Sequence, residues 1–129
     1  MRKGWVPLVR GAGSRYHPPA LATVEEFLAL DVRVGTILSA DALRGARTPS
    51  LDLTIDFGAL GHRRAVVESF EHDEPSELIG LQIAAIVNLV PEQIAGVDSE
   101  ARVLTVGAGP GSRALLMPER PVPDGGRLA

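Results

Sequence analysis

The hydrophobic positions along this chain change their spacing near residue 31. Before that point, apolar side chains recur at helical intervals, at Val24, Phe27, Leu28 and Leu30. Thr23 and Glu26 stand at the spacing of a capping box, in which each side chain accepts a hydrogen bond from the backbone amide of the other residue. The pattern predicts a short helix that follows Thr23 and opens the folded domain.

From Asp31 onward, side chains alternate with the period of two that is typical of a β-strand. One face carries Val32, Val34, Thr36 and Leu38, and the other face carries Arg33, Gly35, Ile37 and Ser39. Gly35 lies in the middle of this strand and predicts a bulge or a sharp bend, which lets a strand curve around a small barrel.

Two further strands follow the first. After a predicted loop over residues 41–50, apolar side chains alternate with polar ones at Leu51, Leu53, Ile55 and Phe57. Gly58 and Gly61 bracket a turn into a third strand over residues 62–67. The first half of the domain is therefore predicted to be a meander of three antiparallel strands.

The second half predicts a short helix and then more strands. Pro75 suits a first helical turn and Gly80 a helix end, so we expect a helix over residues 75–80. Residues 81–90 indicate a strand that is apolar on both faces, residues 91–98 a loop, and residues 102–107 and 113–117 two strands joined by a turn. This order is typical of an all-β OB-fold, a five-stranded barrel with a helix between strands three and four and short flanking elements. A small β-sandwich is the alternative, and the intervening helix counts against it.

Composition places the chain among globular proteins with one core. It has 129 residues, of which 45% are hydrophobic and 22% charged. It has no cysteine, which excludes disulfides, thiolate nucleophiles and cysteine-based metal sites. No apolar stretch reaches the roughly 18 residues of a spanning helix, and no signal-peptide pattern follows Met1, so we expect a cytoplasmic protein without a membrane partner. Residues 1–21, rich in Gly and Pro, are interpreted as a leader or arm, and residues 22–129 as the domain.

Charge is distributed unevenly along the chain. Residues 1–64 carry nine basic and six acidic side chains, and the rest carries four basic and ten acidic ones, for a net charge of −3. The net charge argues against a strong sequence-independent hold on phosphates. All basic residues but Lys3 are arginines, which pair with phosphates through two hydrogen bonds at once. The base composition of a genome explains this preference for arginine equally well.

The sequence offers no convincing catalytic, metal or cofactor site. Residues 107–111 (GAGPG) favour a hairpin turn over a phosphate loop, because Pro110 and Gly111 do not open a helix. Ser69, His72 and Asp73 lie too close together on one loop for a catalytic triad. Two further sets lack the spacing of metal ligands, namely the histidines His17, His62 and His72 and the acidic residues Glu68, Glu71, Asp73, Glu74 and Glu77. We therefore expect no enzyme.

Several short motifs together form the pattern of a known family. In chain order they are residues 31–37 (DVRVGTI), 46–49 (ARTP), 53–58 (LTIDFG), 75–80 (PSELIG), 87–89 (VNL), 93–94 (QI), 99–100 (SE) and 118–125 (PERPVPDG). In these motifs and their spacing the chain resembles the tRNA-binding-domain family, and most of all its small stand-alone CsaA type. The resemblance covers about residues 23–127.

The resemblance implies a non-catalytic OB-fold homodimer whose dimer is built by segments flanking the barrel. It implies binding of structured RNA, tRNA foremost, by shape and backbone rather than by sequence. It also implies an alternative function, that of an export-related chaperone or interaction module that holds unfolded or preprotein peptides, with RNA binding weakened or lost.

The candidate RNA-binding residues are Arg33, Arg47, Arg63, Arg64, Asn88 and Ser99. Arginine side chains suit phosphates, and the two uncharged polar side chains suit sugars or bases. Two of these residues have a structural alternative. Arg33 pairs with Asp31 or Asp52 in that interpretation, and Asn88 caps a strand end through its own backbone.

The chain departs from the family pattern at a few positions. Residues 65–68 (AVVE) replace small polar residues and a Gln of the third strand, Asp98 replaces an apolar residue, and residues 101–102 (AR) replace a Gly-Met pair. We expect Glu68 and Asp98 to repel RNA, and the two valines to favour peptide holding or a tighter dimer. The aromatic share of 4% leaves few side chains on which bases stack.

Overall fold

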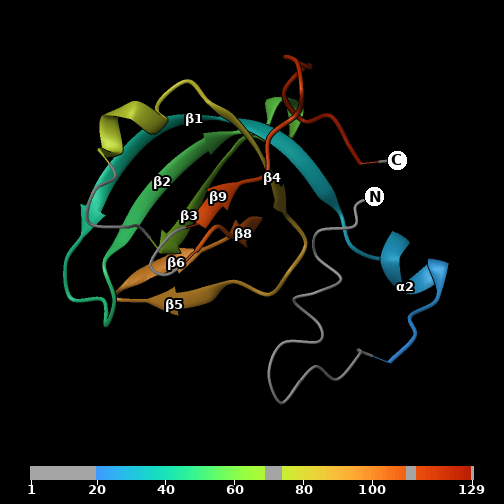
Figure 1. Ribbon diagram of the computed structural model, residues 1–129, viewed down its shortest axis with the longest axis horizontal. Helices are drawn as coiled ribbons and strands as arrows, with labels where there is room; N and C mark the ends of the chain where they lie inside the picture. Colours follow the sequence, from blue (N-terminus) through green and yellow to red (C-terminus); the bar gives the residue numbers. More distant parts are fainter. Residues whose placement is uncertain (1–19, 69–73, 110–112, 129) are drawn as a thin grey trace.

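A computed structural model describes residues 20–68, 74–109 and 113–128 of the chain (Figure 1). Most of the predicted leader, the Ser69, His72 and Asp73 group, and the Pro110 and Gly111 turn lie outside these residues. The helix predicted after Thr23 is present as α2 (Val24–Leu28), and both hydrogen bonds of its capping box form. In the described part of the chain, no helix has the length and apolar character needed to cross a membrane.

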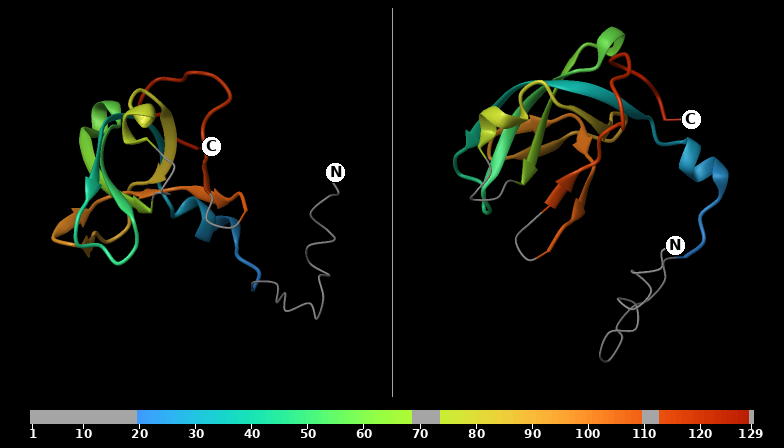
Figure 2. Two further views of the ribbon diagram at one scale, coloured as in Figure 1. Left: turned by 60° about the vertical axis from the view of Figure 1, so that its left-hand side comes forward. Right: turned by 45° about the horizontal axis from the view of Figure 1, so that its top comes forward.

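The domain is built on one five-stranded antiparallel sheet in the order β3-β2-β1-β4-β7. Its strands are β1 (Val32–Leu43), β2 (Ser50–Asp56), β3 (His62–Glu68), β4 (Gln82–Ile86) and β7 (Arg102–Val103). Two small hairpins join it, formed by β5 (Glu92–Ile94) with β6 (Val97–Ser99) and by β8 (Thr105–Gly107) with β9 (Arg113–Leu115). The 3₁₀ turns η2 (Gly58–Leu60) and η3 (Pro75–Leu78) complete the described elements. The sheet curves strongly around its core, as Figures 1 and 2 show, which confirms the predicted all-β, OB-type fold.

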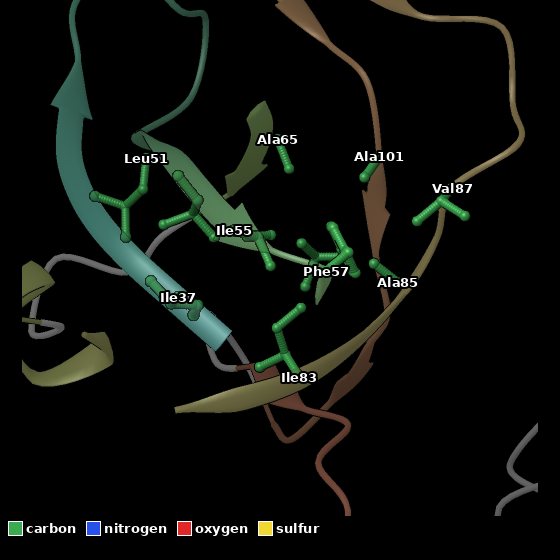
Figure 3. Close-up of a cluster of buried hydrophobic side chains, with 11 residues drawn as sticks. Ile37, Leu51, Ile55, Phe57, Ala65, Ile83, Ala85, Val87 and Ala101 are labelled. Carbon is green, nitrogen blue, oxygen red and sulfur yellow. The ribbon is translucent and has the colours of Figure 1, made fainter. Parts of the chain in front are cut away.

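The core fills the concave side of this sheet (Figure 3). Its largest fully buried side chains are Ile37, Leu53, Ile55, Phe57 and Ile83. The alternation predicted for the second strand is confirmed, because every second residue of β2 is buried.

Gly35 allows β1 to lie against this core. A Cβ atom at this position would lie 2.7 Å from side-chain atoms of both Ile55 and Phe57, and 2.8 Å from the carbonyl oxygen of Asp56. The bulge predicted at Gly35 occurs three residues later, at Leu38, because the pairing of β1 with β2 shifts between Ile37 and Ser39. The glycine therefore makes room for close packing, and the neighbouring irregularity bends the strand.

Residues 99–100, which lead from β6 into β7, form hydrogen bonds with β3. The Ser99 hydroxyl accepts a hydrogen bond from the Val66 amide at 3.0 Å and donates one to the Ala101 carbonyl at 3.3 Å. The Glu100 carboxylate accepts from the Arg64 amide at 2.9 Å, and the Glu100 amide donates to the Arg64 carbonyl at 2.8 Å. Side chains thus replace part of a strand ladder and satisfy the edge of β3.

The segment at residues 121–128 docks on the first half of β1. Gly125 and Leu128 donate backbone hydrogen bonds to Val34 and Val32, and Val34 donates one to Gly126. The segment approaches Phe57 and Gly58 so closely that a Cβ atom on Gly58 would lie 2.3 Å from the Asp124 carbonyl oxygen. Gly58 and Gly125 both have positive φ angles, which suits glycine. The segment therefore extends the barrel wall beyond the end of β2.

Several predicted boundaries were wrong. The predicted loop over residues 41–50 is shorter, because β1 continues to Leu43 and pairs with β2 as far as Ser50. The predicted strand over residues 81–90 is β4 and ends at Ile86, while Leu89 and Val90 are exposed. Beyond Ile86 the chain turns toward α2, where the Val87 amide donates to the Asp31 carbonyl.

Three further elements also differ from the prediction. The predicted loop over residues 91–98 contains the hairpin of β5 and β6. The predicted strand over residues 102–107 divides into β7 and β8, because the chain passes from β4 to β9 at Leu104. The predicted helix over residues 75–80 is the 3₁₀ turn η3, which begins at Pro75 as expected. Its four residues give space for only one turn between β3 and β4.

Candidate functional site

A cavity of about 560 Å³ opens between the loop that joins β1 to β2, the strand β3, the β5–β6 hairpin and the strands β7 and β9. Three arginines from three separate elements line it, namely Arg47 from the loop, Arg102 from β7 and Arg113 from β9. Two carboxylates, Glu68 and Glu92, line it as well. Among the described residues that line the cavity, three are thus cationic and two are anionic.

Two of the cavity arginines are paired with these carboxylates. The Arg113 Nη2 atom lies 2.5 Å from the Glu68 Oε1 atom, and the Thr48 hydroxyl donates to the Glu68 Oε2 atom at 3.4 Å. Arg102 and Glu92 lie farther apart, with 3.9 Å between the closest nitrogen and oxygen. All four charged side chains remain at least two-fifths exposed, so solvent and ligands reach them.

Arg33 lies on β1 outside this cavity and is held by its neighbours. Its Nε atom donates to the Asp31 carboxylate at 2.6 Å, and its Nη1 atom donates to the Gly125 carbonyl at 3.0 Å. The hydrogen bond from Arg33 lowers the pKa of Asp31 below its ordinary value of 3.8. Desolvation raises this pKa by a smaller amount, and the charges of Arg33 and Arg127 lower it further. The guanidinium of Arg33 therefore joins β1 to the docked segment at residues 121–128.

Arg63 and Arg64 follow each other on β3 and point to opposite faces. Arg63 is half-buried and donates to the carbonyls of Leu60 and Val87 at 3.5 Å. Arg64 is half-exposed and forms an ion pair with Asp52 on β2. The hydrogen bond to Asp52 raises the pKa of Arg64, and the charges of Asp52, Glu100 and Asp98 contribute to the rise. Arg64 thus lies in an acidic part of the surface.

Asn88 and Ser99 use their polar atoms within the fold. The Asn88 Oδ1 atom accepts from the Asp31 amide, and its Nδ2 atom donates to the Ala29 carbonyl, both at 2.8 Å. Asn88 therefore fixes the junction between α2 and β1. Ser99 is 8% exposed and lines the cavity wall, where its hydroxyl joins β6 to β3 as described above.

The structure brings only part of the predicted set together. Arg47 and Ser99 line the cavity, whereas Arg33, Arg63, Arg64 and Asn88 lie outside it. Sequence reasoning missed Arg102 and Arg113 as partners of Arg47. The available signal was that both are basic residues in the acidic second half of the chain. Within residues 20–68, 74–109 and 113–128, no group of three metal-ligating side chains lies close enough to hold an ion.

Comparison with known proteins supports one family over most of the chain. Residues 32–127 match the family described as "Putative tRNA binding domain". The solved structure of the chaperone CsaA from Bacillus anthracis is 39% identical, with a TM-score of 0.80, over 85% of this chain and all of that chain. The CsaA chaperone protein from Picrophilus torridus is 32% identical, with a TM-score of 0.78, over 84% of this chain and all of the other.

Curated relatives match the chain with only a small part of their own length. The methionine–tRNA ligase of Methanococcoides burtonii is 38% identical over 100 residues. This match covers 78% of the present chain and 14% of the ligase. The similarity therefore concerns one domain of a much longer enzyme.

Proposed function

Because this chain belongs to the tRNA-binding domain family, we propose that it is a non-catalytic protein that binds structured RNA, tRNA foremost, as a homodimer. The family membership confirms the resemblance seen in the sequence motifs. The observation that carries the proposal is the convergence of Arg47, Arg102 and Arg113 on one cavity. Guanidinium groups from three elements, held at fixed positions by a barrel, suit successive phosphates of a folded RNA backbone.

In this proposal, recognition depends on phosphates more than on bases. Among the described residues that line the cavity, none is aromatic, so none of them offers a ring on which a base stacks. Thr48 and the backbone of residues 45–48 add polar groups at the rim. Such a site reads the spacing of the backbone, as expected for binding by shape.

The other predicted residues enter the proposal with different roles. Arg64 is exposed enough to contact RNA, although it must exchange its pairing with Asp52 for a phosphate. For Arg33, Arg63, Asn88 and Ser99, contact with RNA stays a prediction. Their hydrogen bonds within the protein support a positioning role, because each joins two segments of the barrel wall or its flank.

A salt-dependent titration tests RNA binding. Purified protein is titrated into fluorescently labelled tRNA at about 50 mM and 200 mM salt, and anisotropy gives the affinity. We expect micromolar or tighter binding at low salt and a loss of at least about tenfold at the higher salt, because phosphate contacts release counterions. Affinity that does not change with salt contradicts the phosphate-based proposal.

A pair of arginine variants locates the site. Arg47→Gln removes a cation of the cavity, and Arg120→Gln removes another exposed cation, which lies outside the cavity. We expect about tenfold weaker binding of tRNA by the first variant and little change in the second. Equal effects would show that only the net charge matters.

The dimer is proposed from exposed apolar side chains around α2. None of the residues of α2 is buried, and Val24, Phe27 and Leu28 are 66%, 49% and 52% exposed. Two further segments lie beside this helix, because Asn88 bonds to Ala29 and Arg127 donates to the Leu28 carbonyl. They add the exposed side chains of Leu89, Val90 and Leu128. An apolar surface of this kind suits a second copy of the chain.

Molar mass in solution tests the dimer. Phe27→Asp places a charge in the apolar surface around α2, and Ile79→Asp makes the same change at another exposed apolar residue, directly after η3. Light scattering coupled to size-exclusion chromatography is expected to give a dimer for the unmodified protein and for Ile79→Asp, and a monomer for Phe27→Asp. A monomer in all three samples contradicts the proposal.

Peptide holding is a second proposed function, favoured by the same apolar surface and by the valines that line the cavity on β3. The two solved structures described above are chaperones by their titles. Suppression of light scattering by a denatured model enzyme tests it. If the protein suppresses aggregation but binds no tRNA at low salt, peptide holding replaces RNA binding as the main function.

A further inference from the structure

Glu68 occupies a central place in the arginine cavity. It is the last residue of β3, and its two carboxylate oxygens have different partners. The Oε1 atom pairs with Arg113 on β9, and the Oε2 atom accepts from the Thr48 hydroxyl in the loop between β1 and β2. The Glu68 carboxylate thus connects two sides of the cavity. Each side carries one arginine that we propose binds phosphate, Arg113 on β9 and Arg47 in the loop.

We propose that Glu68 is an internal competitor for RNA phosphate, which holds Arg113 in the free protein and is displaced when RNA binds. The inference rests on the proposed RNA-binding function. It says that Glu68 lowers the affinity of that site for RNA. A carboxylate and a phosphate both present oxygen pairs that match the geometry of a guanidinium. Glu68 therefore fills the position at Arg113 that a phosphate of the RNA backbone would take.

The exposure of the pair makes the exchange feasible. The Arg113 and Glu68 side chains are 44% and 47% exposed, so water already solvates both partners. An exposed ion pair of this kind contributes little to folding, and its opening costs little. After displacement, the Glu68 carboxylate returns to solvent without becoming a buried unpaired charge.

Glu92 differs from Glu68 in the tightness of its contact. Its closest oxygen lies 3.9 Å from Arg102, compared with 2.5 Å between Glu68 and Arg113. The side chains of Glu92 and Arg102 are both about two-thirds exposed. Arg102 is therefore available to RNA without the loss of a close pair. Competition is concentrated at the Glu68 position.

Competition at Arg113 predicts a specific pattern of affinities. Glu68→Gln keeps the size of the side chain and removes its charge, so Arg113 becomes free to bind phosphate. We expect this variant to bind tRNA about twofold to fivefold more tightly at low salt, with a steeper loss of affinity as salt rises. Arg113→Gln is expected to bind more weakly than the unmodified protein.

A double-mutant cycle separates competition from general repulsion. If Glu68 acts by holding Arg113, Glu68→Gln has a much smaller effect in the Arg113→Gln background. If Glu68 only repels the RNA, its removal has the same effect in both backgrounds, and the inference is wrong. Glu77→Gln, an exposed carboxylate on η3 outside the cavity, is the control for net charge and is expected to change affinity little.

A second measurement keeps the inference distinct from the proposed function. Side-chain NMR signals of the arginine Nε–H groups are followed while inorganic pyrophosphate is added. We expect the Arg113 signal to shift, and to shift at lower pyrophosphate concentration in Glu68→Gln. If tRNA does not bind but this pattern appears, the RNA proposal fails and competition at Arg113 stands. If tRNA binds and Glu68→Gln leaves its affinity unchanged, RNA binding stands and the inference fails.

Discussion

The hydroxyl of Ser99 accepts a hydrogen bond from the backbone amide of Val66, 33 positions earlier in the chain, at 3.0 Å. Through this contact a side chain performs the pairing that a neighbouring strand would otherwise supply. Ser99 also donates to the Ala101 carbonyl, so both hydrogen-bonding capacities of its hydroxyl are used in a buried position.

Ser99→Ala tests this contact. We expect the free energy of unfolding to fall by about 1 kcal/mol, because the partly buried Val66 amide loses its acceptor. Urea denaturation gives the value, and Ser76→Ala, at an exposed serine on η3, is the control. Equal stability of the two variants would mean that water replaces the hydroxyl without cost.

Gly35→Ala tests the close packing of β1 on the core. The added methyl group would lie 2.7 Å from Ile55 and Phe57, so we expect a loss of about 1–3 kcal/mol in unfolding free energy. Gly107→Ala on β8 is the matched control, because a Cβ atom there has no neighbour within 4 Å among the described residues. A similar small effect at both positions would show that β1 shifts easily away from the core.

Ala95→Asn tests strain in the turn between β5 and β6. Ala95 has a φ angle of 48° and precedes Gly96, with a φ angle of 84°, as in a two-residue hairpin turn that requires two positive φ angles. Asparagine tolerates this conformation better than alanine, so we expect a gain of about 0.5–1 kcal/mol in thermal or urea unfolding. Ala95→Val, which tolerates the conformation poorly, is expected to change stability in the opposite direction.

The pKa of Asp31 predicts a dependence of stability on pH. Its pKa is lower in the folded protein than in the unfolded chain, so its contribution is present above about pH 4 and is lost as pH falls through the lowered value. Asp31→Asn is therefore expected to destabilise the protein at pH 7 and to make a smaller difference at pH 3. Urea denaturation across this range checks the expectation, and a difference that stays constant with pH would contradict it.

Asn88→Ala tests the junction between α2 and β1. The substitution removes the bonds to the Asp31 amide and the Ala29 carbonyl. We expect faster amide hydrogen exchange in residues 24–31, with an overall loss of about 1 kcal/mol or less, since the site is exposed. If α2 forms the dimer interface, the same variant is expected to dissociate at higher protein concentration than the unmodified protein.

The sequence patterns predicted local features well where one interaction decides the structure. The capping box at Thr23 and Glu26 formed, and the alternation in β2 gave the correct buried face. The end of β1 was harder to predict from the sequence. Gly45 and Pro49 indicate a loop, whereas pairing with β2 extends β1 to Leu43. The β5–β6 hairpin was not predicted, because each of its strands has only three residues, too few to show an alternation of apolar and polar side chains.

The candidate site shows the same division between local and long-range information. Arg47 was found because it lies in a recognisable motif. Arg102 and Arg113 belong to short strands at the opposite side of the cavity, and only the curvature of the whole sheet brings them near Arg47. The pairing of Glu68 with Arg113 could not be predicted for the same reason, because a count of charges along the chain does not show which side chains pair.

The docking of residues 121–128 on β1 also has a consequence for protein synthesis. The contact between Arg33 and Gly125 joins positions 92 residues apart, so a ribosome completes β1 long before it makes the segment that covers this strand. Until then, the first half of β1 is an open edge with free backbone groups, which readily pair with other chains. A nascent chain that pauses before residue 121 therefore exposes this edge during translation, and the edge is covered only once residues 121–128 have left the ribosome and docked on β1.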